Sequence, residues 1–120
     1  MKVADAKIID IPKIEDRRGN LSVVEEFKNV PFHIARAYWL YDVPAGAMRG
    51  GHAHKRLKQL LIALSGSFTV TLDDGHEKRK ILLNRPYQGL LINWNMAHHR
   101  RLLVGCGVPR ARLGAVRRER

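Results

Sequence analysis

The fold is decided by the stretch RGGHAHKRLKQLLIALSG, which runs from Arg49 to Gly66. Its two histidines, His52 and His54, are two residues apart, and residues at that spacing on a β-strand direct their side chains to the same face. In a small β-barrel this face is the interior. Two imidazole rings there predict proton transfer to and from a bound molecule, because histidine titrates near neutral pH.

Short strands separated by turn signals extend outward from this stretch in both directions. Upstream, the polar segment 15–20 predicts a turn in which Gly19 has a positive φ. Downstream, the segment 73–76 predicts a hairpin turn. We expect strands at residues 7–11, 21–26, 34–41, 58–64, 67–72, 78–83 and 87–94. This spacing, with almost no helical periodicity, predicts an all-β sandwich or barrel with a single core.

Residues 95–120 differ in character from the rest of the chain. They contain seven Arg and one Glu, which is more than half of the formal net charge of +11, and they show neither strand nor helix periodicity. We therefore divide the chain into a C-terminally incomplete domain over residues 1–94 and an aberrant basic tail over residues 95–120. The tail is not expected to complete the barrel, because burying unpaired Arg is costly.

Three interpretations of this tail are open: a solvated basic tail, an arm that binds RNA or lipid, and a frameshift. The frameshift is favoured, because codons that encode the segment from Asn95 can read WRTIDDFSSGAV and then CLVLASERYDE in the +1 frame. That string supplies a polar turn, an apolar strand and acidic residues. His98 and His99 lie within the tail and are assigned no role.

Composition narrows the class of protein. The basic excess is concentrated in the tail, and no aromatic interleaving or nucleic-acid motif accompanies it, so no nucleic-acid partner is expected. The modest excess in the body suits an anionic small molecule such as a nucleotide diphosphate. No apolar run is long enough to span a bilayer, and no signal-peptide core is present, so no membrane partner is expected. The single Cys106 permits no internal disulfide and favours a cytoplasmic location.

Several short motifs occur in a fixed order along the body of the chain. They are 16–21 (DRRGNL), 25–26 (EE), 29–32 (NVPF), 34–38 (IARAY), 49–55 (RGGHAHK), 64–67 (LSGS) and 72–75 (LDDG). Their order and spacing resemble the cupin 3,4-ketoisomerases of dTDP-4-keto-6-deoxyhexoses, the FdtA/QdtA or WxcM-like group. The resemblance extends to about residue 94, and the tail departs from it.

The resemblance implies a cupin fold, that is, a jelly-roll or double-stranded β-helix barrel, and an isomerase. The implied reaction moves the keto group of a dTDP-linked 6-deoxy-4-keto sugar from C4 to C3, in deoxy- or aminosugar biosynthesis for a surface polysaccharide. It needs a base for the C3 proton, a donor that stabilises the enediolate and an acid that protonates C4. No cofactor is implied. A homodimer is expected, because pairing through edge strands protects them.

Three residues are candidates for the catalytic groups. His52 and His54 are the expected base and acid, and which of them has which role stays open. Tyr38 is expected on a strand that lines the same cavity, where its hydroxyl can donate to a sugar oxygen or to the enediolate. The alternatives are a hydrogen-bonded core histidine, and an aromatic packed in the barrel with its hydroxyl satisfied locally.

Five polar residues are candidates for binding the substrate. Arg49, just before the histidines, can hold the diphosphate through two parallel hydrogen bonds. Arg18 and Arg36 are further candidates, against the default that a surface Arg forms a solvated salt bridge. Lys55 carries less weight, since it can belong to an exposed edge. Gln59 is expected to hydrogen-bond in the pocket where a metal-binding cupin holds its metal.

Two other classes of function stay open. A metal-binding cupin would use His52, His54 and a later histidine. Gln59 stands where such a cupin has a carboxylate ligand, so no metal is expected. The other class is a sugar-nucleotide-binding cupin without activity, which would follow from the altered tail.

Overall fold

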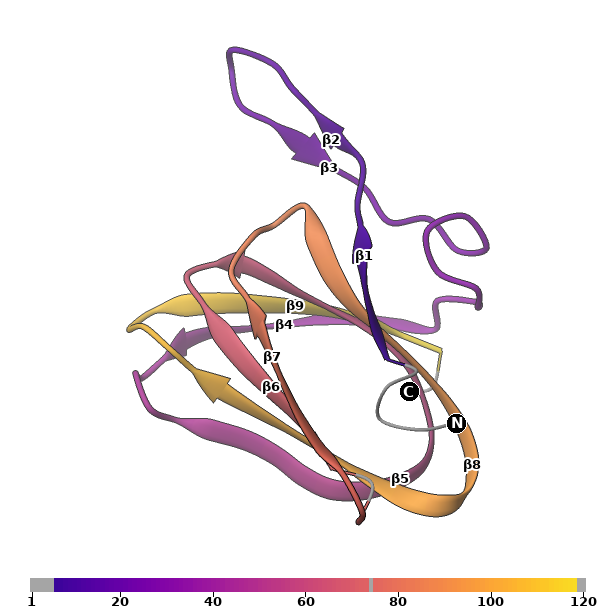
Figure 1. Ribbon diagram of the computed structural model, residues 1–120. Coiled ribbons are helices and arrows are strands. Elements are labelled where there is room, and N and C mark those ends of the chain that lie inside the picture. Colours follow the sequence, from indigo (N-terminus) through magenta and orange to yellow (C-terminus); the bar gives the residue numbers. More distant parts are fainter. Residues whose placement is uncertain (1–5, 74, 119–120) are drawn as a thin grey trace.

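The computed structural model describes the backbone of residues 6–73 and 75–118, and the side chains of these residues outside 50–57 and 94–101. This part of the chain contains nine β-strands and no helix (Figure 1). The all-β prediction is therefore confirmed, and the described residues form no apolar helix of bilayer-spanning length. The strands are β1 (Lys7–Asp10), β2 (Lys13–Ile14), β3 (Leu21–Ser22), β4 (Arg36–Val43), β5 (Met48–Ser65), β6 (Phe68–Asp73), β7 (Lys78–Leu83), β8 (Gln88–Cys106) and β9 (Ala111–Arg117).

Seven of the strands form one antiparallel sheet in the order β4-β9-β5-β8-β6-β7, with β1 added to β8. The long strands β5 and β8 each pair with different neighbours along their two halves. Residues 48–50 of β5 pair with 103–105 of β8, whereas residues 59–65 of β5 pair with β9. The sheet therefore folds over into two facing halves, which is the expected jelly-roll arrangement (Figure 1). Among the described strands no ladder joins β4 to β7, so hydrogen bonding does not close the barrel.

The main core lies between the two halves and is built from alternate residues of each strand. In β6 the side chains of Phe68, Val70 and Leu72 are buried, and those between them are half-buried. The facing half contributes Leu61 and Leu90, which are opposite each other in the β5–β8 ladder. Because side chains alternate along a strand, Tyr38 and Leu40 of β4, Leu61 and Ala63 of β5, and Leu113 and Ala115 of β9 face this same interior.

A second core covers the outer face of the half that contains β9. Segments near the N-terminus supply it, with Ile11, Val30 and Phe32 packed in one cluster with Leu60 and Ile62 of β5. The N-terminal third of the chain therefore acts as a cover for one half of the sheet.

The strand expected over residues 21–26 is wrong in length, since β3 contains only Leu21–Ser22. A side chain competes with the ladder here, because the Asn29 amide oxygen accepts the Glu25 N–H at 2.7 Å and the chain turns. β3 pairs instead with β2, in a hairpin that projects from the sheet (Figure 1). Gly19 in the turn of this hairpin has a φ of 128°, as the sequence predicts.

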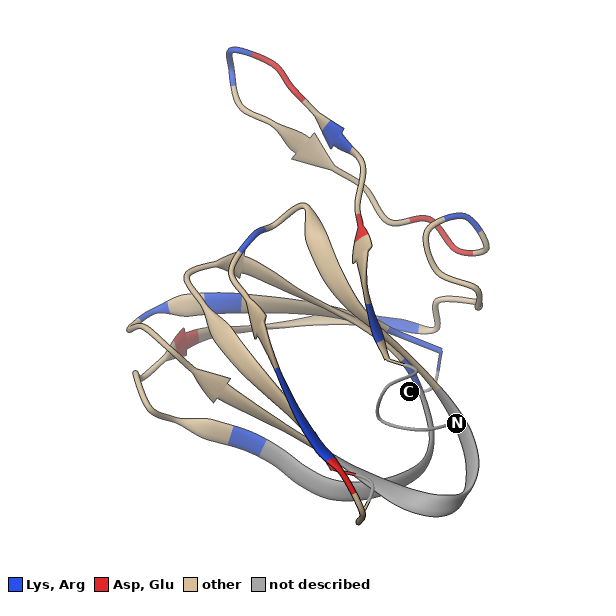
Figure 2. Ribbon diagram, in the orientation of Figure 1, with Lys and Arg blue, Asp and Glu red and all other residues tan. Residues whose placement is uncertain are grey.

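Residues 95–120 contribute strand to the sheet, although their sequence shows neither strand nor helix periodicity as a whole. β8 continues to Cys106, so the proposed boundary at residue 94 falls inside a strand, and β9 lies between β4 and β5. The reason is an alternation of small and medium apolar residues, in which Leu113 and Ala115 are 2% and 4% exposed. The charged residues of β9 lie at its ends, which leaves an uncharged middle to be buried (Figure 2). The +1 reading of the gene stays a prediction, to be tested by sequencing codons 94–97.

Candidate functional site

Four polar side chains lie close together on three neighbouring strands. Arg36 of β4 is directly opposite Arg117 of β9, which in turn is directly opposite Gln59 of β5. Directly opposed residues of a ladder point to the same face, and the next residue in this row is the core residue Ile92. Tyr38, two residues after Arg36, shares that orientation. We call these four residues (Arg36, Tyr38, Gln59 and Arg117) the interior cluster; Gln59 is buried, Tyr38 and Arg117 are half-buried, and Arg36 is exposed at its edge.

A hydrogen bond across β9 joins two of the predicted site residues. The Gln59 amide Nε2 donates to the Tyr38 hydroxyl at 2.5 Å. Gln59 is 4% exposed and is the one buried polar residue among the described side chains. Because the hydroxyl oxygen accepts this bond, its own O–H remains a donor for another group in the interior. Arg36 adds a charge at this point, since its guanidinium carbon lies 4.9 Å from the centroid of the Tyr38 ring.

Arg117 belongs to the cluster, although the sequence analysis did not select it. Its Nε is buried and has no hydrogen-bond acceptor among the described residues. The sequence does not single out Arg117, because it lies in the basic segment 95–120, which shows no regular periodicity as a whole. The spacing of two from Leu113 through Ala115 to Arg117 is the signal that places this side chain on the core face.

Arg49 lies at another place on the sheet, and its side chain is exposed. Its ladder partner is the core residue Val104, and it borders Leu40 and Phe68. No hydrogen bond or ion pair joins it to the interior cluster within the described chain.

Arg18 lies on the projecting hairpin. Its Nη2 is 2.8 Å from Asp16 Oδ2 and its Nε donates to Asp16 Oδ1 at 3.1 Å, while its side chain is 86% exposed. The hydrogen bonds from Arg18 lower the pKa of the Asp16 carboxyl, and the same carboxylate raises the pKa of Arg18. In this chain Arg18 therefore stabilises the turn, and no contact places it beside the other candidates in the described residues.

His52, His54 and Lys55 have side chains outside the described residues. Their backbone lies within β5, so the prediction of a strand at the HxH motif is confirmed. The β5–β8 register shifts between Gly50 and Ala53 and again between His54 and Arg56. Neither the inward orientation of the two rings nor the absence of a metal is tested by this. The described residues outside the motif contain no group of three potential metal ligands.

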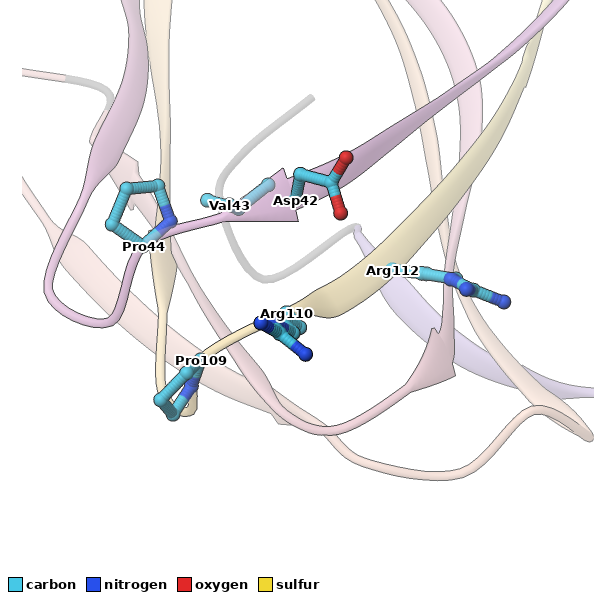
Figure 3. A pocket seen from close by; sticks show the side chains of 6 residues that line it. All are labelled: Asp42, Val43, Pro44, Pro109, Arg110 and Arg112. Atoms are coloured by element: carbon cyan, nitrogen blue, oxygen red, sulfur yellow. The ribbon is translucent and has the colours of Figure 1, made fainter.

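A surface hollow of about 480 Å³ lies at the far end of β4 from Arg36. In Figure 3 the Asp42 carboxylate and the Arg110 guanidinium point in different directions, and no described ion pair joins them. None of the predicted site residues lines this hollow, so we do not assign it to the site. Its lining residues are Asp42, Val43, Pro44, Pro109, Arg110 and Arg112.

Comparison with known proteins gives one consistent result. The family model described as "WxcM-like, C-terminal" (FdtA) matches residues 4–103. A curated relative, TDP-4-oxo-6-deoxy-alpha-D-glucose-3,4-oxoisomerase of Aneurinibacillus thermoaerophilus, is 44% identical over 95 residues, which are 77% of this chain and 68% of the relative. The family match includes every site residue that the sequence predicted and ends before Arg117.

Two solved structures show the same likeness over nearly the whole chain. The TDP-quinovose 3,4-ketoisomerase of Campylobacter jejuni is 37% identical, with a TM-score of 0.88, and the alignment covers 98% of this chain and 88% of that one. A histidine-to-asparagine mutant of a 3,4-ketoisomerase from Thermoanaerobacterium thermosaccharolyticum, in complex with TDP-4-keto-6-deoxyglucose, is 28% identical with the same TM-score. That alignment covers 99% of this chain and 83% of the other.

Proposed function

Because the chain belongs to the WxcM-like family, we propose that it is a sugar-nucleotide 3,4-ketoisomerase. The proposed reaction moves the keto group of a TDP-linked 4-keto-6-deoxyhexose from C4 to C3. The observation that carries the proposal is the family match over residues 4–103, which includes both the HxH motif and the Tyr38–Gln59 pair. The 44% identical relative, itself a 3,4-oxoisomerase, supports the same reaction.

The proposed mechanism consists of three proton transfers, two at carbon and one between the two oxygens, and it leaves the atoms of the sugar unchanged in number. A base removes the C3 proton, the electrons of that C–H bond form a C3–C4 double bond, and the C4 carbonyl becomes an enediolate oxygen. An acid then protonates C4, the C3 hydroxyl becomes the carbonyl, and its proton passes to the C4 oxygen. We assign the base and the acid to His52 and His54, because imidazole works in both directions near neutral pH.

Tyr38 is assigned to stabilise the enediolate. Its oxygen is already engaged as an acceptor by Gln59, which turns the phenolic O–H toward other groups of the interior. A donor held in this way acts where negative charge develops on the C4 oxygen. Arg36 and Arg49 are assigned to the anionic part of the substrate, and the roles of Arg18 and Lys55 stay predictions.

The decisive experiment is conversion of TDP-4-keto-6-deoxyglucose by the purified chain, with the product followed by NMR. His52→Asn and His54→Asn should each lower kcat by about 10²–10⁴, the usual contribution of general acid–base catalysis, with little change in TDP affinity. His33→Asn is the matched control, because His33 is exposed and lies outside the interior. A wild-type kcat in either variant removes that histidine from the mechanism, and no 3-keto product from the unchanged chain refutes the proposal.

We also propose that the enzyme is a cytoplasmic homodimer that serves the biosynthesis of a surface polysaccharide. The buried thiol of Cys106 is unpaired, which fits a reducing compartment. β4 is an edge of the sheet and exposes Trp39 and Tyr41, each 62% exposed, and such an edge favours pairing with a second copy. Size-exclusion chromatography with light scattering should give the mass of two chains. A mass of one chain would contradict the dimer.

A further inference from the structure

Gln59 is the one buried polar residue among the described side chains, and its place in the sheet determines which group it can reach. It lies on β5 between Arg117 of β9 and the apolar Ile92 of β8. Two residues before Arg117 on β9, Ala115 pairs with Tyr38 of β4. Because Ala115 carries only a methyl group, it leaves room for the Gln59 amide to cross β9 and reach the Tyr38 hydroxyl.

The charge of Arg117 favours one orientation of the Gln59 amide. Arg117 is half-buried, and none of the described ion pairs includes it, so its positive charge is not offset by a carboxylate there. A cation attracts the amide oxygen and repels the amide NH₂ group. The nitrogen is therefore the atom left to bind Tyr38, and it donates to the hydroxyl oxygen at 2.5 Å.

The direction of this hydrogen bond determines what the Tyr38 hydroxyl can do. A phenol has one O–H, so an oxygen that accepts from Gln59 keeps its own proton for another acceptor. A carboxylate in place of the amide can only accept, and it would take the single phenolic proton for itself. Gln and Glu have almost the same shape, so the choice between them changes the direction of the bond with little change in packing.

We propose that Gln59 is a positioning residue that keeps the Tyr38 O–H free to donate to the enediolate, an inference that rests on the proposed function. Negative charge develops on the C4 oxygen as the C3 proton leaves. A hydroxyl already turned toward that oxygen needs no reorganisation at this moment. Gln59 acts through Tyr38, because its amide nitrogen is engaged there and its side chain is 4% exposed. A change at Gln59 should therefore lower kcat and leave nucleotide binding almost unchanged.

The test is a double-mutant cycle in steady-state kinetics with TDP-4-keto-6-deoxyglucose, in which Gln59 and Tyr38 are changed singly and together. Gln59→Glu should lower kcat by about 10²–10³, the loss expected for Tyr38→Phe, with KM changed by less than about threefold. In the Tyr38→Phe chain the same change should alter kcat by less than about threefold, because the donor that it redirects is already absent. Gln88→Glu is the matched control, since it makes the same chemical change at the half-buried start of β8, and it should leave kcat within about twofold.

Gln59→Met replaces Gln59→Glu in the cycle if thermal melting shows that the latter does not fold. Methionine has a similar length and shape but no N–H, so kcat should fall by about 3- to 10-fold, the effect of one neutral hydrogen bond. The inference is overturned if the folded variant keeps the kcat of the unchanged chain, or if its loss is as large in the Tyr38→Phe chain. Each of these results leaves the proposed function standing as long as the unchanged chain forms the 3-keto product. An unchanged chain that forms none defeats both.

Discussion

Truncation of Leu113 to Ala should strongly destabilise the protein. Leu113 lies in the middle of β9 and is 2% exposed. Its ladder neighbours are Leu40 on β4 and Ala63 on β5. Ala63 carries only a methyl group, and β9 is held by ladders on both sides, so the structure has little means of filling the space. We therefore expect Leu113→Ala to lower the free energy of unfolding by about 3–5 kcal/mol, the upper part of the range for buried Leu.

This loss should be visible as a large shift in thermal unfolding. For a chain of this length about 1 kcal/mol corresponds to about 4 °C, which gives a decrease in Tm of about 12–20 °C. The assay is circular dichroism in the β-sheet band, with urea unfolding as a second measure. Leu82→Ala is the control, because Leu82 on β7 is 59% exposed and should change the free energy by less than about 0.5 kcal/mol. If both variants melt together, β9 is not packed between β4 and β5, and residues 95–120 are the tail that the sequence suggested.

Three further predictions concern the Tyr38 hydroxyl, the Glu26 carboxyl and the requirement for a metal. Tyr38→Phe should lower kcat by about 10²–10³, as steady-state kinetics will show, because it removes the donor assigned to the enediolate. The same change should lower the free energy of unfolding by about 1–3 kcal/mol, measured by urea unfolding, because the Gln59 amide loses its acceptor. The backbone N–H of Ile34 donates a hydrogen bond to the Glu26 carboxylate and lowers its pKa from the ordinary 4.5, and a second hydrogen bond from the His33 ring adds to this effect. The stability that this carboxylate contributes is therefore complete above pH 4.5 and is lost as the pH falls through the lowered pKa. An NMR titration should show that midpoint below 4.5, and a midpoint at or above it would contradict the prediction. Treatment with EDTA should leave isomerase activity unchanged, whereas stoichiometric zinc, iron or manganese in the purified protein would favour the metal-binding alternative.

The parts of the fold that depend on neighbouring residues could be predicted from the sequence. The β6–β7 hairpin is one example, because the turn residues at 73–76 and the alternation on either side are both local signals, and Gly75 has a positive φ of 86°. The order of the strands could not be predicted, because it depends on pairs such as Leu61 with Ala115 that are far apart in the sequence. β9 was missed because its buried residues are small and Arg112 interrupts them, so tertiary contacts determine its burial.

The candidate site was predicted residue by residue but not as an arrangement. Tyr38 and Gln59 were both selected, yet their hydrogen bond depends on β9, which separates the two strands that carry them. Arg117 comes from that same strand, which lies beyond the domain boundary expected at residue 94. The orientation of His52 and His54 stays a prediction, because their side chains lie outside the described residues.

The position of β9 also sets the order in which the protein can be assembled during synthesis. β9 is made after the eight other strands of the described chain, yet it is the ladder partner of β4, which is made early, and it borders the second half of β5. Until β9 emerges from the ribosome, β4 and β5 each present an open row of backbone donors and acceptors, with Trp39 and Tyr41 exposed beside it. Open edges of this kind pair readily with other chains. A ribosome that stalls before β9 would therefore release a template for aggregation and not a partly active enzyme.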